Sequence, residues 1–158
     1  MYFFSNFFKS LWKISSFISS NKLLLRKTGD SIIATFDDSG IYPEQSLYFT
    51  YHLSDSIRYL YLLTLFNSKL YTWYYRNELI TNIDSTPQLK QFDLDSFPII
   101  KAADEIQIEL ERFALEMIST VKNTNTQKYQ ELEEIINKVI YKIFQLNDEE
   151  IGLIQNEI

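Results

Sequence analysis

Cysteine is absent from this chain of 158 residues, and histidine occurs only once, as His52. The absence of cysteine excludes disulfide scaffolds, thiolate zinc sites and cysteine nucleophiles. A single histidine leaves too few groups for a multi-histidine metal site or a histidine-based catalytic triad. Glycine and proline occur three times each, so we expect regular secondary structure over most of the chain.

The sequence also lacks the short motifs of nucleotide binding and methyl transfer. It has no glycine-rich phosphate or dinucleotide loop, and no Asn/Asp-Pro-Pro-Tyr/Phe run that would hold a target adenine. We interpret Asp37 and Asp38 as a solvated turn, and Asp93 and Asp95 as solvated acids on an edge strand. No Glu-x-Lys arrangement accompanies them, as a metal nuclease site would require. We therefore expect neither catalytic residues nor a metal site in this chain.

Long hydrophobic runs are missing too, although 46% of the residues are hydrophobic and 16% are aromatic. This composition is typical of a folded globular chain, and no stretch is apolar enough to cross a bilayer. The first 20 residues are rich in Phe, but Lys9 and Lys13 interrupt their apolar run. We interpret them as an amphipathic segment rather than a signal peptide. We therefore expect a cytoplasmic protein without membrane contact.

The net charge of −6 is distributed unevenly along the chain. Residues 1–101 hold 10 Lys or Arg and 9 Asp or Glu, whereas residues 102–158 hold 5 and 12. The first 28 residues contain no acid, and their bases are Lys9, Lys13, Lys22, Arg26 and Lys27. A basic edge in front of an acidic tail is compatible with binding to nucleic acid, so the net charge alone does not exclude it.

Periodicity predicts a small sheet in the first third of the chain and helices in most of the rest. Apolar or β-branched runs predict strands over 22–26, 31–36 and 47–53, separated by turns at Gly29 and Gly40. Apolar residues at helical spacing predict a long helix over 55–75, with a break near Asn67 and Ser68 left open. The alternating segment 91–98 predicts an edge strand ended by Pro98.

Two amphipathic helices are predicted over 102–121 and 127–144, followed by a short helix that begins after the cap at Asn147. The expected fold is therefore an α/β (α+β) domain. A small twisted mixed sheet packs against a long helix and is followed by a C-terminal antiparallel helical pair.

The side chains suited to recognition lie in two segments. Arg and Lys neutralise phosphates or reach guanine edges, and Gln and Asn pair with adenine in the major groove. The first segment is the basic turn from Arg26 to Asp30, and the second is the aromatic run from Tyr71 that ends in Arg76-Asn77. For Trp73 to Tyr75 we favour core packing. The candidate DNA-binding residues are Arg26, Lys27, Thr28, Gln45, Arg76 and Asn77.

Three segments carry a resemblance to a known family: Leu23–Phe36, Tyr61–Arg76 with its Asn67-Ser-Lys-Leu70 core, and Leu94–Pro98. Their residues and their order resemble the TaqI-like C-terminal specificity domain. That domain is the target-recognition part of type IIG restriction–modification enzymes and adenine-specific DNA methyltransferases. The resemblance covers residues 22–158, including the ending Ile140–Ile154, and residues 1–20 resemble no part of the family. The Asn-Ser-Lys-Leu helix and the Phe-Pro segment are shared more loosely with type I restriction specificity subunits.

The resemblance implies a non-catalytic chain that recognises double-stranded DNA. A separate methyltransferase or endonuclease domain or subunit would act as partner and would bind S-adenosylmethionine. The expected organisation is an apolar segment 1–21, a target-recognition domain 22–101 and a helical region 102–158. Two alternatives remain open: a protein–protein interaction module that binds no DNA, and an inactive fragment of such an enzyme.

Overall fold

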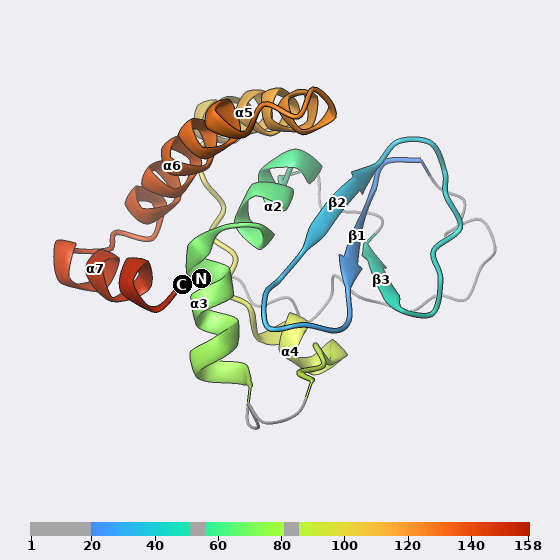
Figure 1. The fold of residues 1–158 in the computed structure, drawn as a ribbon, viewed down its shortest axis with the longest axis horizontal. Helices are drawn as coiled ribbons and strands as arrows, with labels where there is room; N and C mark the ends of the chain where they lie inside the picture. Colours follow the sequence, from blue (N-terminus) through green and yellow to red (C-terminus); the bar gives the residue numbers. More distant parts are fainter. Residues whose placement is uncertain (1–19, 51–55, 81–85) are drawn as a thin grey trace.

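A computed structural model describes residues 20–50, 56–80 and 86–158, and it has the expected α+β architecture (Figure 1). The strands are β1 (Lys22–Arg26), β2 (Ala34–Asp37) and β3 (Leu47–Thr50), in the order β2-β1-β3. Both strand pairs are antiparallel, so the described sheet is wholly antiparallel rather than mixed. Residues 51–53 of the third predicted strand and the first residue, 55, of the predicted helix lie outside the described residues.

The central strand β1 is buried on both faces. Leu23 and Leu25 are fully buried and belong to the main hydrophobic core, while Leu24 lies on the opposite face. Lys22 is fully buried as well, and its ammonium group lies 2.5 Å from the Asp37 carboxylate of β2. Lys22 therefore contributes nothing to a basic surface, and Asp37 is not the solvated turn residue that the sequence indicated.

The predicted helix 55–75 is divided at the break that the sequence left open. Helix α2 runs over Tyr59–Phe66 and α3 over Lys69–Tyr74, and a π-helical turn, η1, continues α3 over Tyr75–Leu79. The Ser68 hydroxyl caps α3 by accepting a hydrogen bond from the Tyr71 amide. The Asn67 side chain accepts from the Ala34 amide (2.8 Å) and donates to the Ala34 carbonyl (3.0 Å). The Asn-Ser pair thus joins α2 and α3 to the edge of β2.

The predicted edge strand 91–98 is wrong, because residues Gln91–Ser96 form the helix α4. The Asp93 carboxylate accepts a hydrogen bond from the Lys90 amide at 2.7 Å, which caps this short helix. Asp93 is buried and Phe92 is 65% exposed, the reverse of what the alternation predicted. Asp95 is half-buried, and burial raises the pKa of its carboxyl.

The C-terminal helices agree closely with the sequence prediction. Helix α5 spans Asp104–Lys122, α6 spans Thr126–Ile143 and α7 spans Asp148–Glu157. Helices α5 and α6 lie side by side above α2, and α7 lies beside α3 (Figure 1). Asn147 caps α7 by accepting hydrogen bonds from the Glu149 and Glu150 amides, as its position in the sequence predicted.

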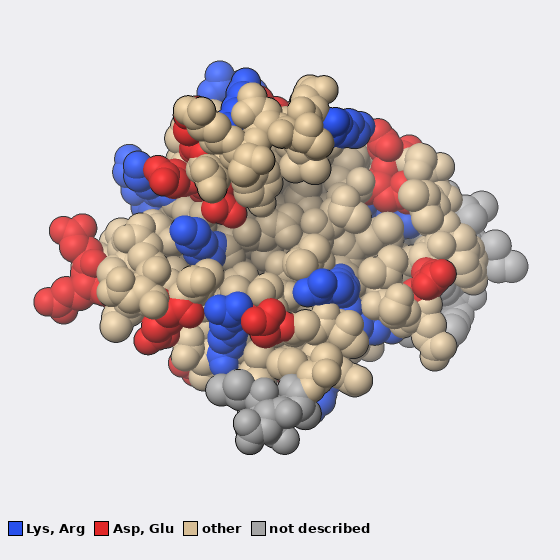
Figure 2. Space-filling model, viewed as in Figure 1, with Lys and Arg blue, Asp and Glu red and all other residues tan. Residues whose placement is uncertain are grey.

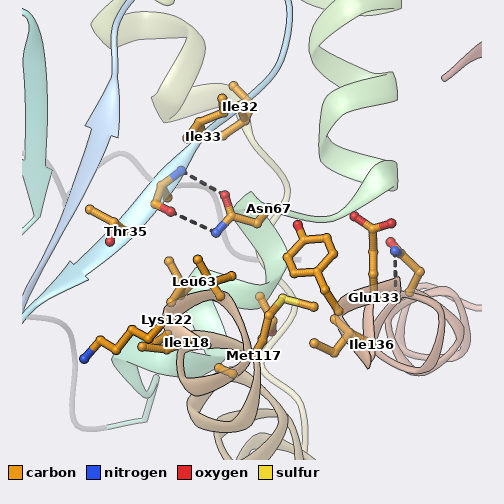
Figure 3. A pocket seen from close by; sticks show the side chains of 16 residues that line it. Ile32, Ile33, Thr35, Leu63, Asn67, Met117, Ile118, Lys122, Glu133 and Ile136 are labelled. Atoms are coloured by element: carbon orange, nitrogen blue, oxygen red, sulfur yellow. Dashed lines mark hydrogen bonds between the residues drawn. The ribbon is translucent and has the colours of Figure 1, made fainter. Parts of the chain in front are cut away.

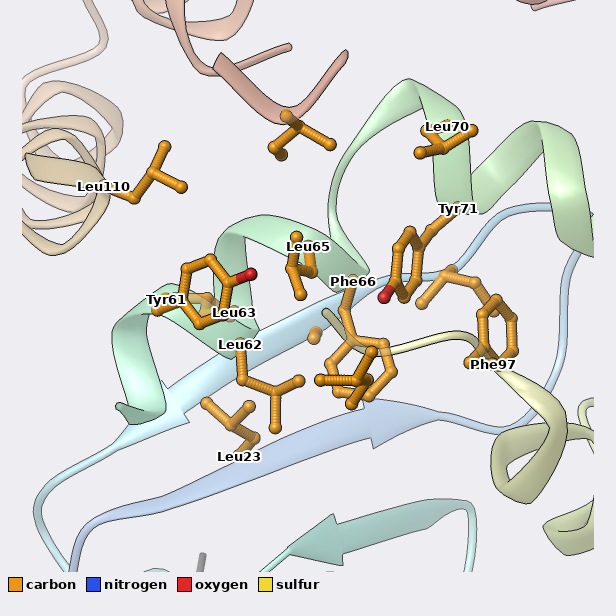
Figure 4. Close-up of a cluster of buried hydrophobic side chains, with 14 of the residues drawn as sticks. Leu23, Tyr61, Leu62, Leu63, Leu65, Phe66, Leu70, Tyr71, Phe97 and Leu110 are labelled. Atoms are coloured by element: carbon orange, nitrogen blue, oxygen red, sulfur yellow. The ribbon is translucent and has the colours of Figure 1, made fainter. Parts of the chain in front are cut away.

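The core lies between the sheet, α2, α3 and the helical pair (Figure 4). Tyr71 stacks on Phe97, with ring centroids 5.1 Å apart, and its hydroxyl donates to the Pro98 carbonyl. Tyr61 donates in the same way to the Ile100 carbonyl. These two tyrosines fix the segment that connects α4 to α5. Core packing is also confirmed for Tyr75, which is buried, and for the half-buried Trp73 and Tyr74.

Candidate nucleic-acid interface

The basic turn from Arg26 to Asp30, which we call the basic bend, lies at the end of β1. Hydrogen bonds on both sides hold its backbone in place. The Arg26 amide donates to the Ile33 carbonyl across the hairpin, and the Leu89 amide donates to the Lys27 carbonyl. Gly29 has φ of +127°, which side-chain-bearing residues rarely adopt, and the Arg26 guanidinium lies where a Cβ of Gly29 would be. The Gly29 amide donates to the Pro87 carbonyl, and the close approach that the glycine permits is that of Arg26.

Lys27 and Gln45 lie close together on this bend, although 18 residues separate them in the sequence. The Lys27 ammonium donates to the Gln45 carbonyl at 2.6 Å and lies 4.5 Å from the centre of the Tyr48 ring. The Gln45 side chain and Arg26 are exposed. Thr28 is exposed as well and pairs with Gln88 in an isolated β-bridge. The structure therefore places Arg26, Lys27, Thr28 and Gln45 at one accessible bend.

Arg76 connects the second predicted segment to the same bend. Its Nε donates to the Asp30 carbonyl at 3.0 Å, and its Nη2 lies 2.9 Å from the Asp30 carboxylate. A hydrogen bond from Ser31 and the charge of Arg76 keep the pKa of Asp30 below its usual value, so this carboxylate stays ionised at neutral pH. The bend and η1 are thus in direct contact, and part of the positive charge of Arg76 is neutralised within the chain.

Asn77 and Trp73 contact α7, which sequence reasoning missed. The Trp73 Nε1 donates to the Glu157 carboxylate at 2.6 Å, and the Asn77 Nδ2 donates to the same oxygen at 3.2 Å. Arg76 Nη1 approaches the Glu157 carbonyl at 3.4 Å. No local pattern could have indicated this cluster, because Glu157 follows Asn77 by 80 positions and Trp73 by 84.

The described surface carries both signs of charge. On the face shown in Figure 2, Lys and Arg side chains alternate with Asp and Glu, and no continuous basic groove is visible there. The acids of α7, Asp148, Glu149 and Glu150, lie in its first turn. On this face the positive charge is therefore carried by separate side chains rather than by a broad positive field.

A separate hollow of about 610 Å³ opens between β2, α2, α5 and α6 (Figure 3). Its lining is mainly apolar and includes Ile33, Leu63, Met117, Ile118 and Ile136. None of the candidate DNA-binding residues lines it. The hollow and the basic bend are therefore different surfaces of the chain.

Within the described part of the chain, no group of three or more His, Asp or Glu residues is arranged to hold a metal ion. Among the helices of that part, none has the length and apolar content needed to cross a membrane.

These features define a small α+β domain whose first half presents an accessible basic bend. The chain belongs to the TaqI-like C-terminal specificity domain family, whose model matches residues 2–99. The match begins earlier than residue 22, where the resemblance was expected to start, and it ends before α5. The family is therefore the one that the sequence indicated, but the C-terminal helices lie outside the match.

The fold is also found in a solved restriction–modification enzyme. The structure of the type IIL enzyme MmeI in complex with DNA matches 85% of this chain with a TM-score of 0.66 at 13% sequence identity. The matched region makes up 20% of the MmeI chain, so this chain corresponds to about a fifth of that enzyme. A search of curated proteins gave no match.

Proposed function

We propose that this chain recognises double-stranded DNA for a restriction–modification system and leaves the chemistry to another domain or subunit. The proposal rests on the membership of this chain in a family of specificity domains. The DNA-bound state of MmeI, which shares the fold, supports the choice of a duplex as ligand. By this proposal, a methyltransferase or endonuclease domain or subunit supplies catalysis and holds S-adenosylmethionine.

Arg26 and Lys27 are the side chains on which we expect duplex binding to depend most. They lie at an accessible bend, and the hydrogen bonds on both sides of the bend hold its backbone in place. The Lys27 ammonium is restrained by Gln45 and Tyr48, which reduces the entropy lost when it meets a phosphate. Thr28, Gln45, Arg76 and Asn77 are the remaining candidates for contacts with phosphates or bases.

The helical half is the surface that we expect to meet the catalytic partner. Ile108 and Leu115 of α5 are 51% and 56% exposed and lie seven residues apart, on one face of the helix. Exposed apolar side chains on one helix face are available for burial against another protein. This feature also favours the second candidate function, a protein–protein interaction module without DNA binding.

The test is binding of a fluorescently labelled duplex at several salt concentrations, measured by polarisation. The double variant Arg26→Ala/Lys27→Ala should bind more weakly, and its salt dependence should flatten by about two released counterions. The matched control is Lys138→Ala/Lys142→Ala, which removes the same charge from exposed positions of α6.

The control variant should keep the salt dependence of the unchanged chain. An equal loss in both variants would show that binding depends only on net charge. No binding at low salt, with or without a catalytic partner, would favour the interaction module instead.

A further inference from the structure

Three donors converge on Glu157 from one side of the helix formed by α3 and η1. Trp73 Nε1 and Asn77 Nδ2 both donate to the same carboxylate oxygen, and Arg76 Nη1 donates to the Glu157 carbonyl. Positions three and four residues apart are neighbours on a helix surface, so Trp73 brings Arg76 and Asn77 to the same side. We call the Trp73, Arg76 and Asn77 groups the donor cluster.

Two members of the donor cluster, Arg76 and Asn77, are held in place by bonds that do not involve Glu157. Asn77 Nδ2 also donates to the Trp73 carbonyl at 3.1 Å, which orients the amide. Arg76 uses Nε and Nη2 on Asp30, so its Nη1 is the nitrogen that remains directed to the α7 side. An acceptor that replaced Glu157 would therefore meet donors that are already positioned.

The hydrogen-bond donors of the cluster favour an anion as their ligand. An indole N–H and a guanidinium donate hydrogen bonds and accept none, and the guanidinium is charged at any physiological pH. A carboxylate and a phosphodiester both offer negatively charged oxygens to such groups. Half or more of the hydrogen bonds between proteins and DNA go to phosphate and sugar oxygens. The contact between Arg76 and Asp30 places the cluster next to the basic bend, where the proposed function puts the duplex.

We propose that the donor cluster is a binding subsite for a phosphate of the DNA backbone, and that Glu157 occupies it in the DNA-free chain. The proposal rests on the proposed function, because the duplex is its ligand. On binding, the phosphate displaces the Glu157 carboxylate and frees the last turn of α7 from η1. Helix α7 thereby competes with DNA for the same donors.

The first test is the duplex affinity of Glu157→Ala, which removes the competing carboxylate. We expect its affinity to rise several-fold, and that of Glu157→Gln to rise less, because its amide oxygen still accepts from Trp73. Glu134→Ala removes an equal charge from an exposed position of α6 and should change the affinity less than twofold. Equal gains in the α6 and α7 variants, or no gain at Glu157, would overturn the proposal while leaving duplex recognition intact.

The second test needs no DNA. In a Trp12→Phe background, Trp73 is the only indole, and its emission reports whether Glu157 is bound. Inorganic phosphate at millimolar concentration should change this emission, because the phosphate replaces the carboxylate as acceptor of the indole N–H, whereas chloride at equal ionic strength should not. If phosphate leaves the emission unchanged, the cluster is not an anion subsite, whatever the duplex measurements show.

Discussion

The two ends of the β1–β2 hairpin are each closed by an ion pair, and the two pairs differ sharply in exposure. At the open end of the hairpin, where β1 begins and β2 ends, the Lys22 ammonium lies 2.5 Å from the Asp37 carboxylate, and the two side chains are 0% and 2% exposed. At the bend, Arg76 and Asp30 are 2.9 Å apart, with side chains that are 29% and 66% exposed. Lys22 and Asp37 also face each other in the strand register.

This difference separates the part of the hairpin that fixes the fold from the part that is available to a ligand. A buried charge that loses its partner is strongly destabilising, so the open end tolerates little change. An exposed pair contributes little to stability and can exchange its partner at small cost. Lys22 and Arg26 are close in sequence, but Lys22 stabilises the fold whereas Arg26 is available to a ligand.

The largest loss of stability is expected from breaking the buried pair of Lys22 and Asp37. Lys22→Ala leaves the Asp37 carboxylate buried without its cation, and the free energy of unfolding should fall by about 3–5 kcal/mol. Urea denaturation followed by circular dichroism measures this loss. Lys101→Ala, at an exposed lysine, should change stability by less than about 0.5 kcal/mol. A small loss in Lys22→Ala would remove the distinction between the two ends.

The open end should also dominate the acid sensitivity of the fold. Burial opposes ionisation of Asp37, but hydrogen bonds from Lys22 and Ser39 outweigh it and lower the pKa to about 2. A lowered pKa stabilises the fold above the unfolded value near 4, and this contribution is lost as the pH falls toward 2. The loss should amount to about 2 kcal/mol for Asp37. In urea titrations between pH 5 and pH 2, the free energy of unfolding should decline less in Asp37→Asn than in the unchanged chain.

The smallest effect on stability is expected from breaking the exposed pair of Arg76 and Asp30 at the bend. A double-mutant cycle on Asp30→Ala and Arg76→Ala should give a coupling free energy below about 1 kcal/mol, because both side chains are partly solvated. The coupling should shrink further in 1 M salt, which screens exposed charges. A coupling of several kcal/mol that persists in salt would mean that the bend is as rigidly built as the open end.

Much of the fold was predictable because its elements are long or carry clear end signals. Helices α5 and α6 have enough residues for an apolar stripe to repeat, and the Asn147 cap marks the start of α7. Helix α4 has only six residues, too few to establish a helical period, and its alternating pattern was mistaken for a strand. The capping carboxylate of Asp93, three residues after Lys90, was the available signal.

The candidate site was predictable in its residue types but not in its partners. The basic bend could be located because Arg26 and Lys27 adjoin a glycine turn. The pairing of Arg76 with Asp30 and of Asn77 with Glu157 depends on tertiary packing across 46 and 80 residues. The burial of Lys22 was equally hidden, because a lysine at the start of a strand is usually exposed.

The most direct test of duplex recognition through the bend is to map the contact surface by NMR. An isotope-labelled chain is titrated with a short duplex, and the amide shifts are followed residue by residue. Changes should concentrate at Arg26 to Asp30, at Trp73 to Asn77 and at Glu157 in the last turn of α7, and the exposed residues of α6 should stay unchanged. Changes confined to α5 and α6, or no changes at low salt, would contradict recognition of DNA through this bend.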